Sequence, residues 1–492
     1  MKGLRSLTIL GALLAALAVP VAAQGHALTY NSFGSSLMPL GEFNTITGAD
    51  YVATKNMHPM GFSFREGYVP GIFGTFGSDL AFWGDKAYHG TWDGFRVLDI
   101  SSPGDPVELV NYKGCAHPSG QGDVVVWDNI LVRTWDSNNS TGATRTCGGE
   151  PVPAGPSGGP AGTGGFEGLH IFDVSNPADP VLMSSVDLTC GSHTASGFPD
   201  VENNRFVVYS TPSSGSCPGI DVVSIPLDDP SSPTYHGFKR AQGLDQNGTS
   251  TNISCHDTGI IRGDANLAAC AGGVGFAVWS MGGERGGSYL EPELQYVHRV
   301  GRGVSVGHSA AFSWDGSTLI FGHEPGGGSG ARCQEAGVGS QTDDMKTLFF
   351  FDALSGELEG THTLPRPQTA DENCTMHNYN IVPTGLKDVL VHGSYQSGIG
   401  VVDFTDRSDI KEIAYADPAP LPRIGSTGQS IQVAGDWSSY WYNGAIYEAD
   451  IGRGVMAWQL SSNVVAGAAK LSYLNPQTQE YTIDGPGNSG SR

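Results

Sequence analysis

The 492-residue sequence is poor in charge, and especially poor in positive charge. Charged residues make up only 15% of the chain, and its 26 Lys and Arg stand against 49 Asp and Glu, which gives a formal net charge of −23. Such an acidic excess repels phosphate groups and excludes non-specific binding to nucleic acid or to anionic lipid. We therefore expect no nucleic-acid partner.

Long apolar runs are scarce as well. The apolar stretch at residues 7–18 is too short to cross a bilayer as a helix, so we expect no membrane span. Lys2 and Arg5 precede this stretch, and Val21-Ala22-Ala23 follows it directly before Gln24. This order is typical of a secretory signal peptide, here over residues 1–23. The sequence thus predicts a secreted protein, extracellular or periplasmic.

Closely spaced cysteines are missing too. The eight cysteines are at least 15 residues apart in sequence, which excludes a Cys-x-x-Cys zinc or redox motif. In an exported chain an even number of cysteines indicates disulfide bonds. Glycine, in contrast, is abundant at 71 residues, about twice its usual share of about 7%. With 20 Phe, 9 Trp and 17 Tyr, the chain is expected to be folded and rich in turns.

A short pattern recurs seven times along the chain. It consists of a glycine, four mostly apolar residues and a polar residue, followed by a turn; the fifth copy lacks the glycine. The copies occupy residues 94–99, 168–173, 219–224, 275–280, 347–352, 398–403 and 454–459. Their starts are 51 to 74 residues apart, a spacing typical of repeat architectures.

Short β-rich segments flank each copy. Two precede it, such as 80–83 and 87–89, and one follows it after a turn that contains proline, such as 107–112. Proline and glycine set the geometry of such turns and are excluded from central strands. Four short strands in each of seven units predict an all-β fold, a seven-bladed β-propeller of four-stranded antiparallel blades. Two unrelated β-sandwiches would not explain seven matched copies.

The first two copies resemble a known repeat. Residues 95–103 and 169–177 are similar to the LVIVD repeat of bacterial and archaeal surface propellers. The resemblance covers most of residues 77–460, although the third copy ends in Ser224-Ile225-Pro226 and the fourth lacks the Asp-Pro turn. It implies a β-propeller and export, and implies little about chemistry.

The propeller prediction divides the chain into four parts. The signal peptide at 1–23 precedes an N-terminal segment at 24–76, the propeller at 77–475 and a polar tail at 476–492. The N-terminal segment has two alternatives: it supplies a closing strand, or it covers the outside. Residues 470–474 compete with it for the outer strand of the seventh blade.

Blade geometry suggests how the cysteines pair. In a blade the start of the innermost strand lies beside the end of the second strand, and the cysteines of blades two, three and four occupy these places. The pairs expected within blades are Cys115–Cys147, Cys190–Cys217 and Cys255–Cys270. Cys333 and Cys374 would then join neighbouring blades five and six.

Histidines recur where the innermost strands begin. These positions hold His117, His193, His256, His308 and His377, with Asp436 in blade seven. A second set, His89, His323 and His392 with Glu448, follows the second strand. The loop before the first strand of a blade and the loop after its second strand lie on the same face of a propeller. Both sets are therefore expected at one channel mouth.

Neutral imidazoles are ligands for borderline transition metals. His117, His193, His256, His308, His377, His323 and His392 are therefore candidate ligands for copper, zinc or iron.

Two classes of function remain open. In the first, the protein is an extracellular binding or scaffold module, and its top face binds a protein, a glycan or a small molecule. In the second, the histidine mouth holds a metal and performs oxidase or hydrolase chemistry. A structural role also explains the pattern, because a repeat duplicates whatever packing histidine its ancestor carried.

Overall fold

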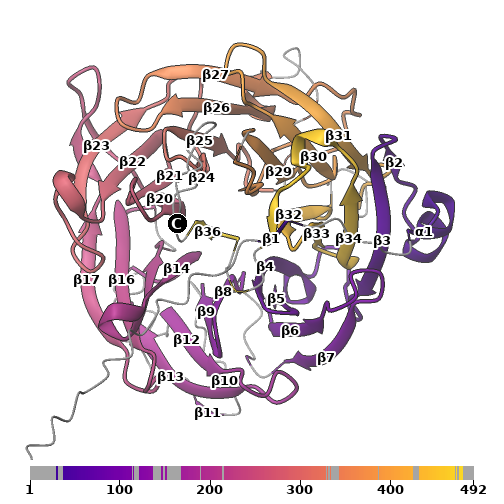
Figure 1. The fold of residues 1–492 in the computed structure, drawn as a ribbon, viewed down its shortest axis with the longest axis horizontal. Helices are drawn as coiled ribbons and strands as arrows, with labels where there is room; N and C mark the ends of the chain where they lie inside the picture. Colours follow the sequence, from indigo (N-terminus) through magenta and orange to yellow (C-terminus); the bar gives the residue numbers. More distant parts are fainter. Residues whose placement is uncertain are drawn as a thin grey trace, which may run out of the picture.

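The computed structural model describes residues 29–30, 37–113, 115, 121–136, 146–147, 150–151, 168–188, 190–212, 215–328, 330, 333, 343–385, 387–424, 432–470, 473 and 476–479. In this part of the chain, seven sheets radiate from a central axis like the blades of a propeller (Figure 1). Each is built on four antiparallel strands, and two of them carry a fifth strand. The predicted seven-bladed β-propeller is confirmed.

The blades follow one another along the chain, each with its innermost strand first. Blade 1 consists of β4 (Gly77–Trp83), β5 (Lys86–Thr91), β6 (Gly94–Asp99) and β7 (Val107–Tyr112). Blade 2 consists of β8 (Val124–Trp127), β9 (Ile130–Trp135), β12 (Gly168–Asp173) and β13 (Val181–Asp187). Blade 3 consists of β14 (Ala195–Asp200), β15 (Arg205–Ser210), β16 (Gly219–Pro226) and β17 (Thr234–Arg240).

Blades 4 to 7 continue the same order. Blade 4 consists of β20 (Cys255–Ile261), β21 (Leu267–Gly272), β22 (Gly275–Ser280) and β23 (Glu293–Arg299). Blade 5 consists of β24 (Gly307–Phe312), β25 (Thr318–His323), β26 (Thr347–Asp352) and β27 (Leu358–Thr363). Blade 6 consists of β28 (Tyr379–Ile381), β29 (Val389–Gly393), β30 (Ile399–Asp403) and β31 (Lys411–Asp417), with β2 (Val52–Ala53) added outside β31. Blade 7 consists of β32 (Asp436–Tyr442), β33 (Ala445–Asp450), β34 (Gly454–Leu460) and β3 (Met57–Phe64).

The described residues also form short strands and helices that are not part of the seven blades. Three two-stranded sheets pair β1 (Thr29–Tyr30) with β35 (Ala469–Lys470), β10 (Thr146–Cys147) with β11 (Glu150–Pro151), and β18 (Gln242–Leu244) with β19 (Ser250–Asn252). The helices are α1 (Leu40–Thr47) and the 3₁₀ turns η1 (Phe73–Thr75), η2 (Val201–Asn203), η3 (Gly283–Arg285), η4 (Asp343–Lys346) and η5 (Asn463–Val465). Within the described ranges, no helix is long and apolar enough to cross a membrane.

The seven sequence copies are the third strands of the blades. A third strand has a neighbour on each side and a blade against each face, which is why its residues form a continuous apolar run. The polar residue that ends the pattern organises the next turn. The carboxylate of Asp99 accepts the N–H of Ser101 at 2.9 Å, and that of Asp403 accepts the N–H of Thr405 at 3.0 Å.

The hydrophobic core lies between adjacent blades. Phe95 and Val97 of blade 1, for example, belong to one buried cluster with Leu131 and Phe172 of blade 2. The rings of Phe95 and Phe172 meet edge to face with centroids 5.0 Å apart. The core is thus distributed around the ring, and each blade depends on both of its neighbours.

The ring closes through a strand from the N-terminal segment. β3 pairs antiparallel with β34, from Met57 opposite Leu460 to Phe64 opposite Gly454. Helix α1 covers this blade from outside, where the ring of Phe43 lies 4.9 Å from that of Trp458. In the competing C-terminal segment, Ala469–Lys470 pair with Thr29–Tyr30 instead.

All four expected disulfides are present. They join Cys115 to Cys147, Cys190 to Cys217, Cys255 to Cys270 and Cys333 to Cys374. The last bond links the blade 5 connection to the segment before blade 6, as the blade geometry predicts.

The closing strand provides a test of ring closure. Gly61 lies at a bulge of β3, where a Cβ would come 2.4 Å from the backbone oxygen of Gly104 in blade 1. We expect Gly61→Ala to lower the free energy of unfolding by about 1–3 kcal/mol, because a backbone turn must shift. Gly41→Ala is the matched control, since nothing lies within 4 Å of that Cβ. Thermal and urea unfolding measure both variants; equal stability of the two would contradict a tight junction between blades 7 and 1.

Candidate functional site

Four of the predicted histidines form a row at the channel. The ring centroids of His193 and His256 are 4.3 Å apart, those of His256 and His308 are 4.0 Å apart, and those of His308 and His377 are 4.1 Å apart. They belong to blades 3, 4, 5 and 6, at or just before the innermost strand of each. The repeat therefore brings equivalent positions into direct contact, as the sequence predicts.

Irregular strand starts turn these side chains toward the channel. The register of β20 shifts between Cys255 and Asp257, and that of β24 shifts between Gly307 and Ala310. A bulge places two successive residues outside the normal alternation of a strand. His256 and Asp257 therefore both line the channel pocket, and so do His308 and Ser309.

A buried carboxylate that sequence reasoning missed completes the cluster. Glu324 follows β25 directly and is only 5% exposed. Its Oε2 lies 3.8 Å from Nε2 of His308, and its Oε1 lies 3.8 Å from Nε2 of His377. The sequence contains one indication of Glu324: this residue directly follows His323, and neighbouring residues on a strand point to opposite faces.

Both imidazoles that face Glu324 are held from their other nitrogen. Nδ1 of His377 lies 2.7 Å from the backbone oxygen of Trp437, which can only accept, so this nitrogen carries the proton. Nδ1 of His308 lies 3.4 Å from Oδ2 of Asp257 and 2.5 Å from Oγ of Ser309. In their neutral forms, both rings therefore direct an Nε2 lone pair toward the same carboxyl group.

Burial dominates the electrostatics of this group. It lowers the pKa of His377 to about 4 and that of His308 well below its usual value, and it raises the pKa of Glu324 to about 7. Burial would also raise the pKa of Asp257, but attraction to His308 and His256 outweighs it and holds this pKa well below its usual range. Asp257 is thus the carboxylate of this group that stays ionised.

The first histidine of the row is in a different electrostatic state. Nδ1 of His193 lies 2.5 Å from Oδ2 of Asp136, and its Nε2 lies 2.8 Å from Nε2 of His256. Burial lowers the pKa of His193, but the charge and hydrogen bond of Asp136 outweigh this effect and raise it. Asp136 was not among the sequence candidates, because it lies in blade 2 and follows β9.

The second predicted set of histidines does not join the row. His323 lies one residue from Glu324 on the opposite face of the chain, where its Nε2 contacts the backbone oxygen of Asp344. His392 hydrogen-bonds Ser394 at 2.8 Å, and His89 lies 3.4 Å from the guanidinium of Arg96. None of these three histidines is thus in contact with the row, and their part in a metal site stays a prediction. His117 lies outside the described residues.

The two acidic positions of blade 7 are also separate from the row. Glu448 accepts hydrogen bonds from Tyr51 and Trp458, each at 2.9 Å. Asp436 accepts one from Ser439 at 2.5 Å. Both are fully buried within the blade, so their contribution is to the packing there.

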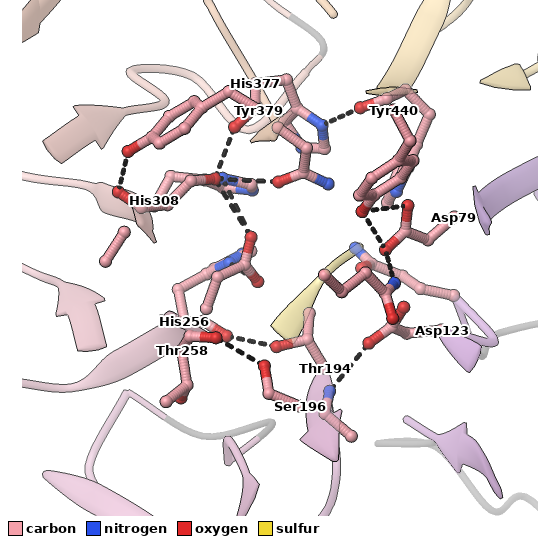
Figure 2. Close-up of a pocket in the computed structure, with 18 residues that line it drawn as sticks. Asp79, Asp123, Thr194, Ser196, His256, Thr258, His308, His377, Tyr379 and Tyr440 are labelled. Atoms are coloured by element: carbon pink, nitrogen blue, oxygen red, sulfur yellow. Dashed lines mark hydrogen bonds and ion pairs between the residues drawn. The ribbon is translucent and has the colours of Figure 1, made fainter. Parts of the chain in front are cut away.

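The row borders a polar pocket in the channel (Figure 2). The pocket measures about 610 Å³ including its open side, and His256, His308 and His377 contribute to its lining.

Asp79 and Asp123, from blades 1 and 2, line the far side of the pocket. The hydroxyl of Tyr440 donates to both oxygens of Asp79, at 2.8 and 2.9 Å. Burial, with the charge of Asp79, raises the pKa of Asp123 well above its usual value. The pocket thus offers imidazoles on one side and an acid pair on the other.

Comparison with known proteins identifies the repeat. The LVIVD repeat matches residues 77–114 and 165–188, which include blade 1 and the two outer strands of blade 2. The expected resemblance is thereby confirmed. No curated protein is significantly similar in sequence.

Solved structures give further matches. The β-propeller domain of Cps50 (Swd1) from Myceliophteria thermophila is 11% identical, with a TM-score of 0.44, and the match covers 79% of this chain and 96% of that domain. A chain of a mitotic checkpoint complex is 12% identical, with a TM-score of 0.45, and the match covers 82% of this chain and 92% of that one.

The histidines at the two ends of the row are expected to have pKa values on opposite sides of the ordinary histidine value. Between about pH 4 and 6.5, we expect His377 to be neutral and His193 to be protonated, because burial dominates at the first and Asp136 outweighs it at the second. Nitrogen-15 NMR of the ring nitrogens in metal-free protein measures both. Asp136→Asn should lower the pKa of His193 and leave that of His377 nearly unchanged. Titration of His377 near 6.5 would contradict this assignment.

Proposed function

We propose that this LVIVD-repeat β-propeller is an exported protein that binds a divalent transition-metal ion, zinc or iron, between His308, Glu324 and His377. The ion would face the channel pocket, where it binds or activates a small ligand. The alternative without a metal is a binding or scaffold module that uses the same face for a protein or glycan.

One observation carries the proposal: two imidazole lone pairs converge on one buried carboxyl group. The Nε2–oxygen distances of 3.8 Å are too long for hydrogen bonds, so direct bonds do not account for the arrangement. Neither Nε2 has a hydrogen-bond partner among the described residues, and a shared cation would bind both nitrogens and the carboxylate at once. A purely structural histidine would use this nitrogen to bond a neighbour.

The spacing suits a small metal ion. Zinc binds imidazole nitrogen and carboxylate oxygen at about 2.0–2.2 Å, so tetrahedral ligand atoms lie about 3.3 Å apart. The observed 3.8 Å therefore requires each side chain to move by a few tenths of an ångström. The whole set is compact, because one ligand atom from each of the three residues lies within 4.8 Å of the other two.

The surroundings suit a metal ligand set as well. Metal-bound imidazoles ordinarily donate their other N–H to a carbonyl or carboxylate, which fixes the ring and the tautomer. The backbone oxygen of Trp437 has this role for His377. For His308 the bonded oxygen is Oγ of Ser309, which in turn donates to Oδ2 of Asp257 at 3.1 Å. The hydroxyl of Tyr395 donates to Oε1 of Glu324 at 2.5 Å and orients the third ligand.

Two histidines and one carboxylate are typical of reactive metal sites. This set binds catalytic zinc in hydrolases and non-haem iron in oxygenases, and it leaves coordination positions open for water or substrate. Here the open side would face the pocket that His308 and His377 line. The ligand set thus favours a hydrolase or an oxidase over a closed structural site. Copper remains a candidate ion because imidazole also suits it.

Export rests on two supports. The signal-peptide pattern covers residues 1–23, and all eight cysteines of the sequence are paired in disulfides. Disulfides persist in oxidising compartments. The proposed metal would therefore be acquired outside the cytoplasm.

Metal analysis tests the proposal directly. We expect mature protein loaded with zinc or iron and then dialysed to retain about one ion per chain by elemental mass spectrometry. Glu324→Gln keeps the shape and removes the charge, so the affinity for zinc should fall at least about 100-fold. His323→Gln is the matched control, because this adjacent side chain faces away, and it should retain the ion. Equal retention by both variants, or no ion in the wild type, would overturn the assignment.

The orienting hydroxyl gives a graded test. Tyr395→Phe removes the hydrogen bond to Glu324 and keeps the ring against His377, whose centroid is 4.5 Å away. We expect zinc affinity to fall about tenfold while the stoichiometry stays at one. Competition with a chromophoric chelator measures the affinity. An unchanged affinity would mean that Glu324 is not a ligand.

A further inference from the structure

A short C-terminal strand lies inside the ring. β36 (Thr478–Gln479) runs beside the innermost strand of blade 4 in the middle of the channel (Figure 1). It pairs parallel with β20, Thr478 opposite Ile260 and Gln479 opposite Ile261, and the N–H of Arg262 donates to the oxygen of Gln479 at 2.8 Å. Parallel pairing requires a long crossover connection, which the preceding chain provides from blade 7.

The same segment also contacts two other blades. The side-chain amide of Asn380, in blade 6, donates to the backbone oxygen of Pro476 at 2.7 Å. The amide of Gln477 donates to Oδ2 of Asp79, in blade 1, at 2.6 Å. Residues 476–479 therefore bridge the channel between blades 1, 4 and 6.

The segment differs from the structural strands around it. It contains Pro, Gln, Thr and Gln and buries no large apolar side chain, whereas the blade strands are apolar. Thr478 is fully buried and Gln479 is 5% exposed, yet Oγ1 of Thr478 and Nε2 of Gln479 have no hydrogen-bond partner among the described residues. Unpaired buried polar atoms weaken binding. The segment is thus held by a few directed hydrogen bonds, as a bound peptide is.

We propose that the inner edge of β20, together with Asp79 and Asn380, is a binding site for an extended polar peptide, and that residues 476–479 of the same chain occupy it. Recognition is by strand addition, in which backbone bonds supply affinity and side chains supply specificity. Asp79 selects an amide donor at the position of Gln477, and Asn380 selects the backbone carbonyl of the residue before it.

Occupancy of this site shapes the neighbouring pocket. Gln477 lines the pocket together with His256, His308 and His377. Figure 2 shows the strand passing between the acid pair and the histidines. Release of the segment therefore enlarges the pocket. This inference does not depend on a metal, because β20, Asp79 and Asn380 are not proposed ligands.

Peptide binding to a shortened chain tests the proposal. In a chain that ends at Tyr473, we expect a fluorescent peptide of residues 474–484 to bind with one-to-one stoichiometry by anisotropy. The full-length chain should not bind it, since its own segment fills the site. A Gln477→Ala peptide should bind at least about tenfold more weakly, because it lacks the bond to Asp79. Equal binding of the native and a scrambled peptide would overturn the proposal.

A second measurement uses the full-length chain and does not require truncation. Gln477→Ala combined with Thr478→Pro should release the segment, and the amide of Arg262 should then exchange with deuterium at least about 100-fold faster. The amide of Val278, in β22 of the same blade, is the internal control and should keep its protection. Unchanged protection of Arg262, or loss of protection at both positions, would show that the segment is an integral strand of the fold and would overturn the proposal.

Discussion

The pairing of β3 with β34 is the constraint on which the rest of this molecule depends. Seven blades share buried faces with both neighbours only when the first and last are joined, and here a strand from the N-terminal segment makes that joint. Hydroxyl groups then connect the innermost strands. Ser78 donates to the backbone oxygen of Gly122, Thr194 to that of His256, and Ser309 to that of His377. These bonds set the distance between successive strand starts, and hence between the imidazoles.

The candidate site is assembled by neighbouring blades, and no single blade contains it. His308 and Glu324 come from blade 5, and His377 precedes the first strand of blade 6. The backbone oxygen that fixes the tautomer of His377 belongs to Trp437 in blade 7, and the carboxylate beside His308 belongs to Asp257 in blade 4. Four blades thus orient three side chains. Because rigid strands carry the groups, the geometry needs little reorganisation when a ligand arrives.

The sequence was informative wherever a repeated pattern had a local cause. Third strands are buried on both faces, so their apolar runs predicted the blades, and the blade geometry then predicted all four disulfides. The row from His193 to His377 was predictable because it occupies one repeated position. Glu324 was not, because strand alternation turns it to the channel and turns the more conspicuous His323 away. Asp257 faces the channel through a bulge, and a bulge has no reliable signature in one sequence. The role of the N-terminal segment stayed open because its partner strand is distant in the chain.

That distance has a consequence for how the protein is made. Met57 and Leu460 are paired in the finished molecule, but about 400 residues must be synthesised between them, which takes roughly 20–80 s at typical ribosome speeds. During that interval β3 has no partner, and an unpaired strand is prone to join strands of other chains. A newborn chain therefore benefits from a chaperone that keeps β3 apart from other chains until β34 has been made. Ring closure therefore has to wait until the last blade has been synthesised.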